Sequence, residues 1–171
     1  MPGQAIGTSM LYGYPGAYAR NGDCNIRNRI VKGTDITGPS FGDPVVLNTD
    51  NTYSKFGATG TAATFAGVAV KEVKQDTAYS TTFGSYSPGQ PCDVINRGSV
   101  MVKCNVGTPT SGGKAYIRVV ANESIPAGVI GGFEAAADST NTIEITNCKW
   151  NTGKKDANGV CELSILTKVN P

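Results

Sequence analysis

Residues 114–120, KAYIRVV, hold the clearest structural pattern in the chain. Ala115, Ile117 and Val119 alternate strictly with residues that bear a polar group. Those intervening residues are Lys114, Tyr116 and Arg118. A repeat of two is the spacing of a β-strand with one buried face, whereas an amphipathic helix repeats every three to four residues. The stretch therefore predicts a half-buried strand and favours a β-rich chain.

A second strand pattern precedes it, over residues 94–104. The residues that would share one pleat face are Val94, Val100, Val102 and Cys104. The pattern predicts either a pair of strands that reverses near Gly98 or one bulged strand. A reversal at Gly98 would place Cys92 and Cys104 face to face across a hairpin, where a bridge could form.

Two further regions read as strands. Residues 142–150 and 160–169 alternate around a polar loop, NTGKKDANG, and predict a hairpin that ends the domain. Its second half has Leu163, Ile165 and Val169 on one face. Residues 65–73, FAGVAVKEV, predict a strand that leaves the core at its charged end. Gly67 within it marks a bulge or a close backbone approach.

The remaining segments lack such periodicity. Residues 34–64 and 76–91 are rich in Thr, Ser, Gly, Asn and Pro, and predict loops. Residues 133–137, FEAAA, have good helix propensity but are too few to nucleate a helix alone, so at most one helical turn is expected. Short strands with few helices predict an all-β fold, an antiparallel β-sandwich or barrel of jelly-roll type.

Composition limits the classes of partner. The 171 residues fit one domain, and folding of such a chain hides roughly 70% of its unfolded surface. Charged residues make up 16% of the chain, against about 25% in typical globular proteins, which suggests a surface covered by neighbours. The 15 basic and 13 acidic residues give a net charge of +2 without a basic block. Neither nucleic acid nor a membrane is therefore expected as a partner.

The sequence shows neither a targeting segment nor a cysteine motif. The chain as given starts without a secretory signal, and no stretch approaches the about 18 apolar residues of a transmembrane helix. The five cysteines are Cys24, Cys92, Cys104, Cys148 and Cys161. They form an odd set without a CxxC pair, so reduced structural thiols are expected rather than a metal site or disulfides.

Catalytic residues are hard to find. The chain has no histidine, which removes the commonest general base and every Ser-His or Cys-His pair. A two-carboxylate glycosidase would need two of Asp93, Glu123, Glu134, Asp138, Glu144 and Glu162. Solvated surface acids are the favoured interpretation of these residues. Asp50 and the Asp156 loop lack the alternating acids of a calcium loop, so turn chemistry explains them better.

The amino-terminal part of the chain has a different character. Residues 9–33, SMLYGYPGAYARNGDCNIRNRIVKG, are polar and rich in Tyr and Arg, and lack the apolar periodicity needed to fold alone. We expect an extended N-terminal arm over residues 1–33, followed by a single β-rich domain over residues 34–171. Tyr and Arg are favoured in protein interfaces. The predicted interface residues are Tyr12, Tyr14, Pro15, Tyr18, Arg20, Arg27 and Arg29.

Two alternatives remain open for this arm. It either folds back and covers an edge of its own sheet, as antiparallel proteins often require, or reaches onto a neighbouring subunit. Under the second alternative the arm becomes ordered only against another protein surface.

The order of short motifs resembles the structural cement, or head decoration, family of tailed bacteriophages. The matching pieces are GYPGAYAR at 13–20, NRIV at 28–31, FGDPVV at 41–46, FAGVAV at 65–70, YSPGQP at 86–91, and Val94 followed by RGSV at 97–100. Each piece alone is weak, and their order over residues 10–104 makes the resemblance specific. The last third matches only loosely, and its hairpin from Cys148 to Cys161 looks like a local elaboration.

The resemblance implies a structural, non-enzymatic protein without cofactor or metal. It implies a virion component, assembled in the host bacterial cytoplasm, that binds the outer capsid surface at junctions between major capsid proteins. The implied partners are the major capsid protein and further copies of the chain, as a homotrimer or alternatively a dimer.

Two other classes are retained as alternatives. A carbohydrate- or receptor-binding β module would use Trp150 and the tyrosines as a stacking platform. Trp150 as an ordinary packing residue is the favoured interpretation. A small β-barrel enzyme would have to work with carboxylates alone.

Overall fold

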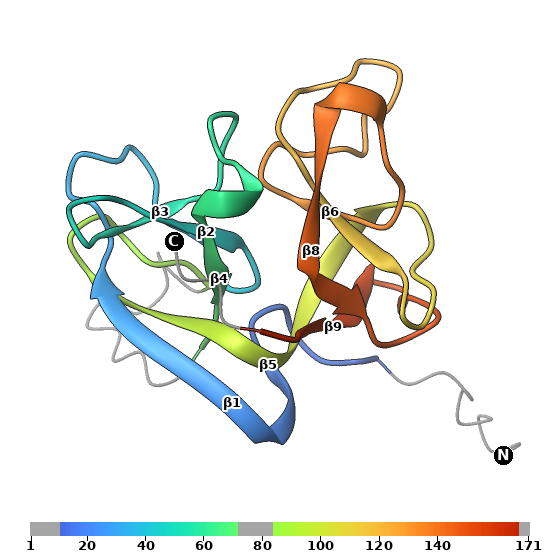
Figure 1. Cartoon of the computed structure of the whole chain (residues 1–171), viewed down its shortest axis with the longest axis horizontal. Helices are drawn as coiled ribbons and strands as arrows, with labels where there is room; N and C mark the ends of the chain where they lie inside the picture. The colour runs from blue at the N-terminus through green and yellow to red at the C-terminus, as the bar shows by residue number, and fades with distance from the viewer. Residues whose placement is uncertain (1–10, 72–83, 168–171) are drawn as a thin grey trace, which may run out of the picture.

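The computed structural model describes residues 11–71 and 84–167, and within them the chain is built from strands and turns (Figure 1). The strands are β1 (Tyr18–Ile30), β2 (Pro44–Leu47), β3 (Tyr53–Lys55), β4 (Phe65–Ala69), β5 (Pro91–Val106), β6 (Lys114–Arg118), β7 (Phe133–Glu134), β8 (Thr142–Trp150) and β9 (Val160–Ile165). Two single-turn 3₁₀ helices, η1 (Ala62–Thr64) and η2 (Ser139–Asn141), complete the set, and this part of the chain holds no α-helix.

Five of these strands close a barrel. Strand β5 pairs with β7, β7 with β6, β6 with β8, β8 with β9, and β9 again with β5. The β5–β7 pair is parallel and the other pairs of the ring are antiparallel. The predicted all-β barrel or sandwich is therefore confirmed, with a closed barrel as its centre.

The other strands gather on the first half of β5. Strands β1 and β4 pair antiparallel with β5, and β2 and β3 follow β4 outward. An isolated parallel bridge between Val31 and Tyr53 joins the end of β1 to β3. Figure 1 shows β5 running from this group to the group of β6, β8 and β9. One long strand thus belongs to both halves of the molecule.

The buried residues form two cores. The larger core includes Trp150, Phe133 and Ile117 of the barrel strands and extends to β4. The smaller core lies among β2, β3, β4 and the start of β5, and includes Val45 and Tyr53.

Strand β5 supplies residues to both cores, and its alternation shifts near its middle. Cys92 and Val94 lie in the smaller core, whereas Ile95 and Val100 lie in the larger one. Ile95 and Val100 are an odd number of positions apart, and a regular strand would place them on opposite faces. Gly98, with φ of +123°, lies between them and permits the shift.

This geometry decides between the two interpretations of residues 94–104. They form part of one bulged strand, and the hairpin that would place Cys92 opposite Cys104 is wrong. The expectation that Val94 shares a face with Val100 is also wrong, because the bulge at Gly98 separates them.

Strand β4 behaves as predicted at Gly67. Its φ is +145°, the β2–β4 register shifts beside it, and a Cβ there would collide with the carbonyl oxygen of Ile95. The position is therefore both a bulge and a close approach. Lys71 is exposed where the strand leaves the core, and Glu72 lies outside the described residues.

The loop prediction for residues 34–64 is only partly right. Strands β2 and β3 and helix η1 lie within it. Both strands are short, and Pro44 begins β2, so neither gives a long alternating pattern. For residues 76–91, the described part from Gly84 to Gln90 consists of turns and a bridge between Ser40 and Ser85.

Strand β6 confirms the alternation of residues 114–120 with one exception. Ala115 and Ile117 are fully buried and Lys114 is exposed, but Arg118 is fully buried too. No helical turn forms at residues 133–137, which is within the expectation of at most one, because Phe133 and Glu134 form β7, held between β5 and β6. Tertiary pairing overrides local propensity there.

The C-terminal hairpin is confirmed. Strands β8 and β9 pair antiparallel, with Trp150 opposite Leu163 and Cys148 opposite Ile165. Leu163 and Ile165 are buried as expected. Val169 lies outside the described residues.

The region expected to be an arm contains β1, which is the second-longest strand of the described residues. Residues 18–30 form β1 and pair with β5 from Tyr18 opposite Val100 to Ile30 opposite Pro91, with several register shifts. The fold-back alternative therefore describes this part of residues 1–33. Whether the segment also contacts another subunit, and whether a domain begins at residue 34, stay predictions.

Candidate functional site

The segment before β1 is fixed to the barrel through its backbone. Gly16 N–H donates to the Met101 carbonyl at 2.7 Å, and Met101 N–H donates to the Ala17 carbonyl at 2.9 Å. Farther out, Tyr12 N–H donates to Asp156 Oδ2 at 2.9 Å. Asp156 Oδ1 also caps its own turn through the N–H groups of Asn158 and Val160. Residues 12–17 thus follow a defined path over β5 and the β8–β9 loop.

The side chains of this segment are unevenly buried. Tyr14 is 83% exposed and Leu11 is 59% exposed, although the neighbouring backbone is bonded in place. Pro15 lies close to Gly42, where a Cβ would collide with the proline ring. Tyr18 packs against the larger core. Leu11 and Tyr14 therefore expose side chains on a backbone that is already fixed in place.

Arg20 is tied to the barrel. Its Nε donates to Glu162 Oε1 at 2.9 Å, and Glu162 is 4% exposed. Asn151 Nδ2 donates to the same oxygen at 2.7 Å. Burial alone would raise the pKa of Glu162, but the hydrogen bonds from Arg20 and Asn151 outweigh it, so the pKa lies below its usual value. Arg20 therefore helps to hold β1 to β9.

Arg27 and Arg29 lie together on β1. The Arg29 guanidinium carbon lies 5.6 Å from the centre of the Tyr53 ring, at the distance of a cation–π contact. Burial raises the pKa of Tyr53, and the positive charges of Arg29 and Arg27 partly offset that rise. Arg27 is exposed. Neither arginine has an ion-pair partner among the described residues.

The seven predicted interface residues thus form three groups. Tyr12, Tyr14 and Pro15 lie on the bonded N-terminal segment, and Tyr18 turns inward beside it. Arg20 joins Glu162, and Arg27 and Arg29 border Tyr53. Their role as an interface stays a prediction. Sequence reasoning did not single out Leu11 or the exposed Ile36, whose only sequence signal is an apolar residue in a polar stretch.

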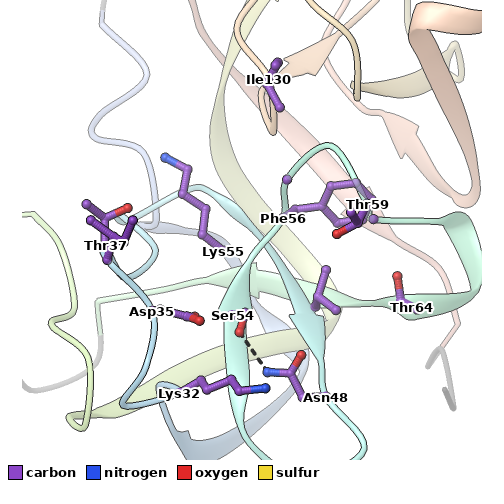
Figure 2. A pocket seen from close by; sticks show the side chains of 14 residues that line it. Lys32, Asp35, Thr37, Asn48, Ser54, Lys55, Phe56, Thr59, Thr64 and Ile130 are labelled. Atoms are coloured by element: carbon purple, nitrogen blue, oxygen red, sulfur yellow. Dashed lines mark hydrogen bonds between the residues drawn. The ribbon is translucent and has the colours of Figure 1, made fainter.

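A groove with a volume of about 580 Å³ lies beside β2 and β3 (Figure 2). Its wall includes Lys32, Asp35, Lys55 and Ile130. The figure shows Asn48 donating to Ser54, a bond of 2.7 Å. The two lysines are engaged elsewhere, by ion pairs of Lys32 with Asp50 and Lys55 with Asp43. Polar side chains line the groove, and no nucleophile–base pair is found among its lining residues.

Glu123 is exposed, and the other acidic residues considered for a glycosidase have structural partners. Glu144 pairs with Lys114 at 2.8 Å, and Glu162 with Arg20. Asp93 accepts a hydrogen bond from Asn28 at 2.7 Å. Asp50, considered for calcium, accepts from the backbone and hydroxyl of Thr52, as expected of a turn.

Glu134 and Asp138 belong to a buried network that the sequence did not reveal. The guanidinium of Arg118 makes a two-pronged contact with Glu134, and its Nη1 donates to Asp138 Oδ2 at 2.7 Å. Hydrogen bonds from Asn122 and Arg118 lower the pKa of Asp138. The arrangement joins β6, β7 and the turn before η2, and engages both carboxylates in hydrogen bonds with Arg118.

Trp150 is 1% exposed and packs edge-on against Phe133, with ring centres 6.4 Å apart. It is therefore a core residue, as the favoured interpretation held, and it offers no surface on which a sugar could stack. The structure contradicts the proposed Trp150 platform.

The thiols and candidate metal ligands form no site in the described residues. All five cysteines are unbridged. Burial raises the pKa of the Cys92 and Cys148 thiols, which keeps them protonated and unreactive. Over residues 11–71 and 84–167, no group of three or more His, Cys, Asp or Glu side chains gathers as metal ligands. No helix in the same ranges is long and apolar enough to span a membrane.

Comparison with known proteins adds two findings and one negative result. A chain of the solved capsid of Myoviridae phage XM1 matches with a TM-score of 0.71 at 18% identity, over 98% of this chain and 99% of that chain. At that identity the likeness establishes the fold. No curated protein sequence matches.

A family model provides the stronger relation. The model described as XM1 gp53 minor capsid protein matches residues 3–165. The match includes the last third of the chain, which the motif comparison had related only loosely. It supports a phage capsid component, described as a minor capsid protein rather than specifically as a cement protein. The chain belongs to the XM1 gp53 minor capsid protein family.

Proposed function

We propose that this minor capsid protein acts as a cement protein on the outer surface of the phage shell. In this proposal it assembles in the host bacterial cytoplasm, binds where major capsid subunits meet and ties them together. One observation supports this role best: Leu11 and Tyr14 are exposed on a segment whose backbone is bonded to the barrel. Such side chains can be buried by a partner without a large ordering cost, because their backbone is already placed.

Binding to the assembled shell alone would stabilise that shell, because binding and assembly are then thermodynamically linked. A protein that binds only the assembled shell stabilises it by about 2.7 kcal/mol per site when present at a hundred times its dissociation constant. Repeated over many sites, modest contacts would strengthen a shell under internal pressure. We also propose a homotrimer as the bound form, because several copies of the segment would then engage together and gain avidity.

The test uses shells purified from phage that lacks the gene for this chain, incubated with full-length protein. We expect wild-type protein to decorate them and to raise the temperature at which they rupture. Tyr14→Ala should reduce occupancy at limiting protein, because it removes the most exposed ring of the segment. Val120→Ala, which trims another exposed apolar residue two positions after β6, is the matched control. Absence of wild-type binding to intact shells would overturn the proposal.

A further inference from the structure

Strand β1 is an edge strand along its second half. It pairs with β5 on one side, and no described strand lies along the other side between Ile26 and Asn28. Figure 1 shows β1 at the outer margin of its group of strands. Arg27 and Asn28 are exposed. An exposed edge presents unpaired backbone groups to which another strand can add.

The direction of those backbone groups follows from the hydrogen bond just beyond the C-terminal end of β1. Val31 N–H donates to Gln90, so Val31 faces the β5 side. Along an antiparallel strand the N–H and C=O groups of successive residues point to alternate sides. Arg29 and Arg27 therefore face β5 as well, whereas Asn28 and Ile26 face outward.

The partner strand agrees with this assignment. Asp93 lies opposite Asn28. Its backbone carbonyl accepts a hydrogen bond from Val70 N–H, on the β4 side of β5. Asp93 thus faces away from β1, as the partner of an outward-facing Asn28 must. The outward edge of β1 consequently offers two N–H and two C=O groups, those of Ile26 and Asn28.

Charge indicates what kind of strand would fit. The two other charged residues of β1 are neutralised, Arg20 by Glu162 and Asp23 by Arg97. Arg27 and Arg29 are two residues apart on one face, next to the open edge, and no described carboxylate pairs with them. A strand added to this edge would place alternate side chains beside them.

We propose that an extended segment of the major capsid protein, with carboxylates two residues apart, adds to β1 as a further strand. Its backbone would bond to Ile26 and Asn28, and its carboxylates would pair with Arg27 and Arg29. This inference rests on the proposed function, because it names the chemistry of the same capsid partner. The competing role for the arginines is protective, since charged side chains on edges also prevent pairing.

The test compares paired variants of the full-length protein on the shells described above. Asn28→Pro removes the outward N–H, whereas Asn28→Ala removes only the side-chain bond to Asp93. Arg27→Glu reverses an exposed charge beside the edge, and Lys154→Glu makes the same change in the exposed β8–β9 loop. We expect Asn28→Pro and Arg27→Glu to weaken shell binding at least about tenfold, with both controls close to wild type.

Hydrogen exchange provides a readout that does not depend on a variant folding. The amides of Ile26 and Asn28 should exchange quickly in the free protein and slowly on the shell. If wild-type protein binds shells, but these amides stay unprotected and Arg27→Glu binds normally, strand addition is wrong and the cement role stands. If wild-type protein does not bind at all, both proposals fall.

Discussion

At the scale of single residues, Arg118 shows what sequence periodicity can and cannot reveal. The alternation over residues 114–120 places it correctly on the face away from Ile117. It does not reveal that this face is also covered, because the covering carboxylate, Glu134, comes from β7, a strand that the sequence presents as a helix former. The burial of a charge depends on its partner, and a partner distant in sequence has no local signal.

We predict that Arg118→Met lowers the free energy of unfolding by about 3–5 kcal/mol, because it leaves the Glu134 carboxylate buried and uncompensated. Chemical denaturation measures the change. Lys114→Met, which removes the exposed pair with Glu144, is the control and should have little effect. The double variant with Glu134→Leu should regain much of the stability. A single variant as stable as wild type would contradict the role given to this network.

The buried Glu162 leads to a prediction about acid. Its pKa in the folded protein lies below the ordinary value of 4.5, so the unfolded chain takes up its proton first as the pH falls. The stability it contributes is complete above pH 4.5 and is lost as the pH falls through the lower, folded value. Arg20→Gln removes the main bond that lowers this pKa. The melting temperature of the Arg20→Gln variant should therefore fall less than that of wild type as the pH is lowered. Equal falls in melting temperature for the two proteins would contradict the role given to the Arg20–Glu162 bond.

At the scale of elements, the strands that the sequence placed most directly have a run of alternating residues. Strand β6 and the β8–β9 hairpin are of this kind. Strands β2 and β3 have only four and three residues, too few for a period to show. Strand β1 was missed for another reason: most of its exposed residues are polar and its pairing has several register shifts, so its sequence resembles an unstructured arm.

Strand β5 illustrates a different limit. The apolar residues were recognised, but their division between two cores depends on the bulge at Gly98. A glycine in a strand is compatible with a turn or with a bulge. Only the pairing of both halves of β5 with their neighbours decides between the two.

We predict that Gly98→Ala destabilises the fold by about 1–3 kcal/mol, because φ of +123° is unfavourable for alanine. The added Cβ would also lie 2.8 Å from the carbonyl oxygen of Asp23 in β1. Gly57→Ala is the matched control, since it has ordinary φ and nothing within 4 Å of the new atom. Thermal unfolding of the two variants provides the comparison, and equal stability would argue against a strained bulge.

At the scale of the whole molecule, the chain is a closed barrel with a second group of strands attached through β5. The candidate contact residues lie on different parts of this body. Leu11 and Tyr14 lie on the barrel side, and Arg27 and Arg29 lie on β1, at the edge of the second group of strands. A protein with contacts on two parts is suited to bridging neighbours, which is the property that a cement role requires.

The central claim is that this body binds the outer surface of the shell between major capsid subunits. An image reconstruction of the phage particle, compared with one from phage lacking the gene, tests it most directly. We expect difference density for the barrel outside the shell at subunit junctions, with Tyr14 and the β1 edge turned toward capsid protein. Density inside the shell, or a position over the centre of a single subunit, would contradict the account.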